Sequence, residues 1–94
     1  MNIPREARLA HHRRPDVIIG KKGVTMGVLK EIDRRLEDQG IVKVKMLKTA
    51  IQAEGGDDRR TIASRVAKSL DAVLVGVRGR TFVLYRRPGI RKFK

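Results

Sequence analysis

Short β-branched runs alternate with helical patterns along this chain, and this alternation restricts its fold more than any other feature of the sequence. Residues 17–19 form an apolar run between a proline and a glycine, which predicts a strand buried on both faces. Apolar residues then recur every four positions, which predicts an amphipathic helix over about 25–38 that Gly40 ends with a left-handed cap. Residues 41–47 alternate in polarity and predict a second strand with its lysines on the outer face.

The second half of the chain repeats this alternation. After a loop expected over 48–56, Asp57 or Asp58 should cap another helix. The inner stripe of that helix comprises Ile62, Ala63, Val66, Ala67 and Leu70. Residues 73–77 and 81–85 then predict two strands joined by a tight turn, hence a hairpin.

A short helix over residues 6–12 precedes the first strand, and Ala7, Leu9 and Ala10 are expected to touch the core. The element order is therefore α-β-α-β-α-β-β. This order predicts an α/β (α+β) two-layer sandwich with a mixed four-stranded sheet. Two consecutive strand–helix–strand units favour right-handed crossovers and largely parallel pairing, to which the final hairpin adds one antiparallel strand.

The charge of the chain limits its partners. Its 94 residues suit one domain, and 23 Lys and Arg against 10 Asp and Glu give a formal net charge of +13. A polyanion relieves the self-repulsion of such a chain, so we expect a nucleic acid and no small-molecule substrate. The absence of cysteine excludes thiolate metal sites and disulfides. No apolar run approaches the roughly 20 residues of a membrane span, so we expect a cytoplasmic protein without membrane contact.

The sequence Gly20-Lys21-Lys22-Gly23 lies between the first predicted strand and the helix that follows it. Glycines allow a sharp turn and leave no side chain between the backbone and a ligand. The following helix would direct free amide groups and its positive dipole end to the same point. Thr25 is expected to cap this helix with a hydroxyl that could also reach a phosphate. We therefore expect a phosphate-binding loop held by backbone amides and two lysines.

The spacing of the glycines separates this loop from nucleotide-binding loops. A Walker loop has four residues between its glycines and then Lys-Ser/Thr, and a dinucleotide fingerprint has the pattern Gly-x-Gly-x-x-Gly. Neither occurs here, and the remaining Gly-x-x-Gly pattern is the one with which KH domains clamp a nucleic-acid backbone. The same spacing at residues 76–79 leads into a strand and predicts a hairpin turn whose Arg78 and Arg80 could touch phosphate.

Four blocks of sequence follow one another along the chain, at residues 19–25, 27–32, 42–45 and 79–86. In residue type and order they resemble the CRM domain (chloroplast RNA splicing and ribosome maturation, YhbY-like), over about residues 9–87. The resemblance implies a mixed four-stranded sheet similar to the C-terminal domain of a bacterial initiation factor. It also implies RNA binding through the glycine loop and no enzymatic activity. Stand-alone members of this family associate with precursors of the large ribosomal subunit, and plant members assist intron splicing.

The chain departs from the family pattern at three places. The segment before Pro15 is short, the stretch over 47–60 is longer than in bacterial members, and the glycine usual after the third helix is absent near Leu70-Asp71. None of these departures affects the glycine loop.

Basic residues outside the loop are expected to widen the contact with RNA. Seven basic residues and no acidic one occupy residues 78–94, including a basic tail over about 87–94. Five phosphate contacts to single-stranded RNA would give a log–log salt slope of about −3.5. The predicted RNA-binding residues are Gly20, Lys21, Lys22, Gly23, Thr25, Arg13, Arg14, Arg78, Arg80, Arg86 and Arg87.

Other polar residues favour structural roles, and we expect no metal and no cofactor. His11 and His12 are adjacent and so do not share a helix face, which favours surface histidines whose protonation below about pH 6.5 strengthens any RNA contact. Glu54, Asp57 and Asp58 lack the alternating spacing of a calcium loop and are expected to cap a helix.

Aromatic residues are too few for the base-stacking sheet of an RNA-recognition motif. Phe82 and Tyr85 lie on opposite faces of their predicted strand, so at most one ring is free to stack on a base.

The sequence thus predicts a non-catalytic RNA-binding protein with one domain over residues 1–94, monomeric outside the particle it serves, that binds ribosomal RNA during large-subunit assembly. A structural ribosomal protein, stably embedded in the ribosome, requires the same charge. A DNA-binding or membrane-surface module also fits the charge. An enzyme is disfavoured because no paired carboxylates and no Ser–His arrangement are evident.

Overall fold

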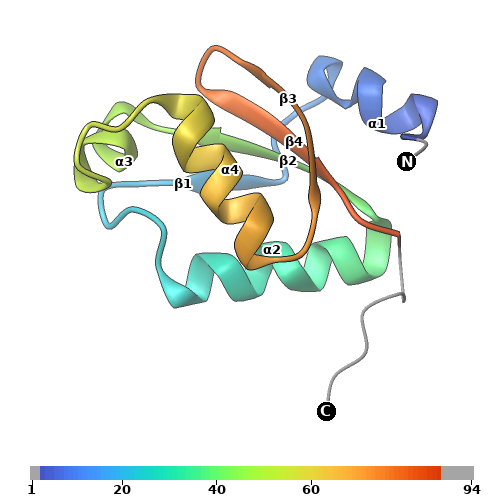
Figure 1. Cartoon of the computed structure of the whole chain (residues 1–94), viewed down its shortest axis with the longest axis horizontal. Helices are drawn as coiled ribbons and strands as arrows, with labels where there is room; N and C mark the ends of the chain where they lie inside the picture. Colours follow the sequence, from blue (N-terminus) through green and yellow to red (C-terminus); the bar gives the residue numbers. More distant parts are fainter. Residues whose placement is uncertain (1–2, 88–94) are drawn as a thin grey trace.

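The computed structural model describes residues 3–87, which form the helices and strands drawn in Figure 1. In chain order they are α1 (Arg5–Leu9), the 3-10 helix η1 (Ala10–His12), β1 (Val17–Ile19), α2 (Met26–Gln39), β2 (Ile41–Met46), α3 (Lys48–Ala53), α4 (Arg59–Ser69), β3 (Val73–Arg78) and β4 (Thr81–Tyr85). Each predicted helix and strand is present, and α3 is an addition. Apart from Arg87, the predicted basic tail lies outside the described residues.

The four strands form one mixed sheet in the order β1-β2-β4-β3. β1 is parallel to β2, whereas β4 is antiparallel to both β2 and β3. The mixed sheet is confirmed, but the prediction of largely parallel pairing was wrong because β4 lies between β2 and β3. β4 takes this inner position because Phe82, Val83 and Leu84 bury both of its faces, whereas no residue of β3 is fully buried.

The main core lies between the sheet and the two long helices, with α4 crossing in front of the strands in Figure 1. Strands β2 and β4 contribute alternate residues to it, and the predicted apolar stripes of both helices face it. Thr25 caps α2, since its Oγ1 accepts a hydrogen bond from Val28 N at 3.1 Å. Gly40 ends α2 in the left-handed conformation, with φ 80°. Both predicted ends of this helix are confirmed.

Helices α1 and η1 pack mainly against the strands β2, β3 and β4. Ala7 and Ala10 are buried on this side, as is Val83, which points away from the main core. Ile18 of the edge strand β1 is 58% exposed, so the prediction that this strand is buried on both faces was wrong. Leu9 is 49% exposed, because it points away from the sheet that Ala7 and Ala10 contact, and its predicted core contact was also wrong.

Helix α3 occupies a stretch that the sequence predicted to be a loop. Its six residues, Lys-Thr-Ala-Ile-Gln-Ala, are compatible with a helix, but only Ala50 is fully buried. A segment this short contains too few apolar positions to show a helical period. Gly55 and Gly56, both with positive φ, follow its C-cap residue Glu54.

Asp71 adopts φ 56° after the end of α4. A side chain at positive φ strains the backbone, which glycine does not. We expect Asp71→Gly to raise the free energy of unfolding by about 0.5–1 kcal/mol, measured by urea unfolding. Asp71→Ala is the control, because alanine keeps the Cβ atom and gains nothing. Equal stabilities of the two variants would contradict this explanation.

Candidate nucleic-acid interface

The glycine loop is a turn that displays its two lysines. Gly23 N donates a hydrogen bond to Gly20 O at 2.9 Å, which closes the turn. Gly23 is buried and has φ +72°, and a Cβ atom there would lie 2.5 Å from Glu54 Oε2. Lys21 and Lys22 are exposed at the tip. The loop therefore needs glycine at Gly23 for both conformation and space.

Glu54 supports this loop from the end of α3. Its Oε2 accepts a hydrogen bond from Val24 N at 2.8 Å, and its other carboxylate oxygen lies 3.5 Å from the guanidinium of Arg65. The sequence predicted a helix-capping role for Glu54, which was wrong. Because the contact joins residues 30 positions apart and α3 was not foreseen, nothing in the local pattern pointed to it.

These contacts change the predicted role of the loop amides. Gly23 N and Val24 N already have acceptors within the protein, so the expectation that backbone amides of the loop hold the phosphate was wrong for Gly23. The side chains of Lys21 and Lys22 remain outside the turn and accessible. The exposed side chains of these two lysines are thus the part of the loop that is available to an anion.

Strand pairing brings the loop and the β3–β4 turn to one end of the sheet. Ile19, the last residue of β1, pairs with Met46, and Met46 N donates to Arg80 O at 2.7 Å. Arg78 pairs with Thr81 at the same end. We call this region the basic end; its cations are Lys21, Lys22, Lys45, Lys48, Arg59, Arg78 and Arg80.

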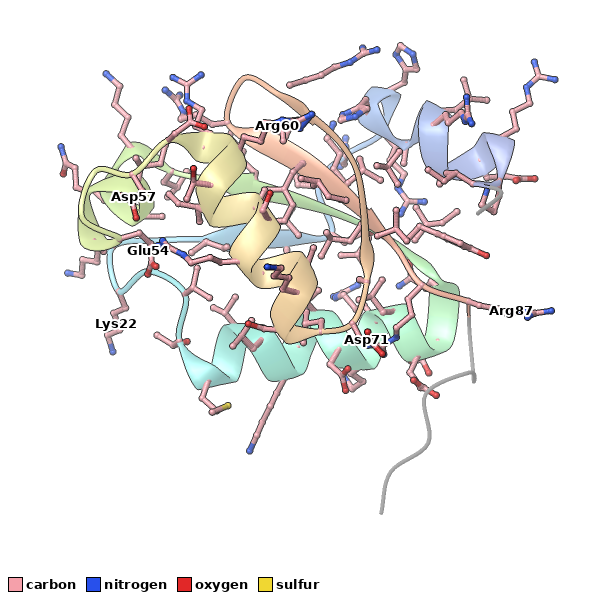
Figure 2. All side chains as sticks on the ribbon, in the orientation of Figure 1. Lys22, Glu54, Asp57, Arg60, Asp71 and Arg87 are labelled. Atoms are coloured by element: carbon pink, nitrogen blue, oxygen red, sulfur yellow. The ribbon has the colours of Figure 1, made fainter. Side chains whose placement is uncertain are left out.

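The remaining predicted arginines belong to the other end of the sheet. Arg13 donates to Ile41 O at 3.0 Å and pairs with Asp16 at 2.9 Å. Arg14 and Arg87 are exposed. Figure 2 shows Lys22 and Arg87 at opposite ends of the molecule. The predicted set is therefore divided between two surfaces.

Arg86 is a structural residue, contrary to the prediction that it contacts RNA. Its side chain is only 3% exposed and lies between α2 and the end of α4. The guanidinium donates to Asp33 Oδ1 at 2.8 Å, to Leu70 O at 2.6 Å and to Glu37 Oε1 at 3.1 Å. A cation enclosed in this way cannot reach a phosphate.

A family model for the CRS1/YhbY (CRM) domain matches residues 5–86. The chain belongs to this family. It is 42% identical over 85 residues to a probable RNA-binding protein of Methanocaldococcus jannaschii, covering 89% of this chain and 60% of that relative's length. It is 37% identical over 81 residues to an RNA-binding protein of Haemophilus influenzae, covering 83% and 74% of the two chains.

The fold of the CRM domain is also that of a solved relative. The solution structure of a hypothetical Staphylococcus aureus protein, described as a candidate RNA-binding protein, matches with a TM-score of 0.69 and 30% identity. The match covers 94% of this chain and 88% of that one. Predicted family and fold are thereby confirmed.

Three cations of the basic end were not predicted as site residues, namely Lys45, Lys48 and Arg59. Lys45 was expected on the outer face of its strand. Its pairing across the sheet with Ile18 and Thr81, which places it at the basic end, was not expected. Parallel pairing of β1 and β2 was the signal that could have found Lys45 and Lys48, because parallel strands end at the same edge. Arg59 could be assigned to the basic end only once the position of α4 in the fold was known.

The histidines and aromatic rings contribute little to this interface. His11 is half-buried; burial, with Arg78 and Lys43 nearby, lowers its pKa, so the predicted threshold near pH 6.5 is too high for this residue. Phe82 is fully buried and Tyr85 is half-buried, as the face prediction required. Within residues 3–87 no three His, Asp or Glu side chains are grouped to hold a metal ion. No helix of that range has the length and apolar character to cross a bilayer.

Proposed function

We propose that this CRM domain is a non-catalytic, cytoplasmic protein that binds ribosomal RNA during assembly of the large subunit, through the basic end. The observation that supports this most is the convergence of seven cations from the glycine loop, β2, α3, α4 and the β3–β4 turn at one end of the sheet. The net charge of +13 agrees with a polyanionic partner. The ribosomal assignment rests on the resemblance to stand-alone members of the family.

The lysines of the glycine loop are proposed as the main phosphate contacts. Glu54 fixes the loop from inside through its bond to Val24 N, so Lys21 and Lys22 start from a defined position and lose less freedom on binding. Contacts to phosphate set position rather than read bases. Specificity is therefore expected to come from RNA shape and unpaired segments.

The test is the charge-reversed variant Lys21→Glu/Lys22→Glu, measured by fluorescence anisotropy with structured ribosomal RNA fragments. We expect an affinity loss of about 100-fold and a log–log salt slope smaller in size by about 1.4, because two phosphate contacts are lost. The control is Lys30→Glu/Lys68→Glu, which makes the same charge change at exposed sites on α2 and α4. Thermal unfolding should show that both variants fold.

Two measurements can contradict the proposal, the comparison with the control variant and sedimentation with ribosomal particles. If the loop variant and the control lost the same affinity, the loss would come from the change in net charge and not from the position of Lys21 and Lys22. In sucrose gradients the wild-type chain should sediment with large-subunit precursors, and the loop variant should not. One copy in every mature subunit would instead support a stably embedded ribosomal protein.

A further inference from the structure

A hollow of about 460 Å³ lies at the basic end, where Lys48, Arg59 and Arg80 line it. It is formed by α3, the segment that leads into α4, and the β3–β4 turn. The volume is within the range of sites that hold small ligands. Its walls include Lys48, Ile51, Gln52, Asp58, Arg59 and Arg80.

The hollow collects positive charge from three separate elements. Lys48 comes from α3, Arg59 from the first turn of α4, and Arg80 from the β3–β4 turn. Guanidinium and ammonium groups pair well with phosphate oxygens. The cations of the hollow therefore suit a phosphate group.

Polar groups of other kinds share the same hollow. Asp58 occupies the N-cap position of α4, yet its side chain makes no capping hydrogen bond. Asp57, by contrast, is held by Arg65 at 2.8 Å. Gln52 is exposed and Ile51 is partly buried beside it. A carboxylate would repel a bare phosphate, but carboxylate and amide groups accept hydrogen bonds from the amino groups of bases.

We propose that the hollow is a subsite for one unpaired nucleotide of the bound RNA. Arg80, Lys48 and Arg59 hold the phosphate, while Gln52 and Asp58 read the edge of the base above the apolar surface of Ile51. In a duplex this base edge is already paired and cannot enter the hollow, so the subsite favours single-stranded segments. The inference rests on the proposed RNA-binding function and adds that the site selects unpaired nucleotides.

The decisive variant removes the base-reading groups and leaves every cation in place. Gln52→Ala/Asp58→Ala removes one negative charge, so simple charge attraction would raise its RNA affinity. The subsite predicts the opposite for unpaired RNA. Gln39→Ala/Asp38→Ala is the matched control, because it makes the same changes at exposed positions near the end of α2.

The probes are 12-nucleotide single strands of each of the four bases and a 12-base-pair RNA duplex, measured by fluorescence anisotropy in one buffer. We expect the subsite variant to lose about tenfold in affinity for the preferred single strand, and to bind the duplex as well as the wild type or better. The control should lose nothing on any probe. Unchanged or higher affinity of the subsite variant for all four single strands would overturn the subsite and leave the proposed function standing. Failure of the wild type to bind any of these probes would overturn the subsite, and failure to bind structured ribosomal RNA fragments as well would overturn both.

Discussion

Replacing Arg86 by alanine is expected to lower the free energy of unfolding by about 3 kcal/mol, a large effect for a single charged residue. The guanidinium bridges Asp33 and Glu37 of α2 to the carbonyl of Leu70 at the end of α4. Its removal leaves two carboxylates without the cation between them, and the Leu70 carbonyl loses one hydrogen-bond donor. The carboxylates are 23% and 32% exposed, so water offsets part of the loss.

Urea unfolding followed by circular dichroism measures this effect, and in thermal unfolding it corresponds to a fall of roughly 15 °C for a domain of this size. Arg87→Ala is the matched control, because Arg87 is the next residue and is exposed. We expect Arg87→Ala to change stability by less than about 0.5 kcal/mol. Arg86→Lys should fall between the two, since lysine keeps the charge but cannot bridge the four acceptors that the guanidinium contacts. Similar stabilities for Arg86→Ala and Arg87→Ala would refute the structural role.

Arg86 and Arg87 also show how far a sequence can locate a site. Both follow β4 and both are basic, so they were predicted together as RNA contacts. The alternation of β4 already separates them, because Arg86 continues the series of Phe82 and Leu84, which face the core. Extending that alternation by one residue beyond the strand would have assigned Arg86 to the interior.

Local patterns were sufficient to locate α2 and β2 because each signal lies within one element, but the predicted outer face of β2 was wrong for Lys43, which is buried and donates to His11 O and Arg13 O. The four-residue apolar period, the threonine cap and the terminal glycine define α2 without reference to anything else in the chain. The insertion of β4 between β2 and β3 has no such signal, since it depends on which strand can bury both faces. Sequence therefore predicted the elements better than their pairing.

The same distinction applies to the candidate site. The glycines and lysines of the loop, Gly20 to Gly23, are contiguous in the sequence and were predicted from their spacing and their place between a strand and a helix. The carboxylate of Glu54, which fixes the loop, comes from a short helix with almost no apolar pattern. A contact across 30 residues depends on the packing of α3 against the end of β2, and single-sequence patterns do not contain that information.

Replacing Gly23 by alanine should disturb both stability and RNA binding through Glu54. The added Cβ would lie 2.5 Å from Glu54 Oε2 and 3.1 Å from Ala53 Cβ, in a backbone with φ +72°. The carboxylate must move, which breaks its bond to Val24 N. Left-handed strain and the lost bond together give an expected destabilisation of about 2–3 kcal/mol. At temperatures where the variant stays folded, we expect RNA affinity to fall about tenfold, because Lys21 and Lys22 lose their fixed position.

Gly20→Ala is the control for this variant, because a Cβ at Gly20 has no neighbour within 4 Å and its φ is not positive. It should leave stability within about 0.5 kcal/mol of the wild type. A double-mutant cycle with Glu54→Ala then isolates the cause. If the clash with the carboxylate dominates, Glu54→Ala removes it, and the combined variant is more stable than the sum of the two changes predicts by about 1 kcal/mol. Additive effects would show that Glu54 does not hold the loop.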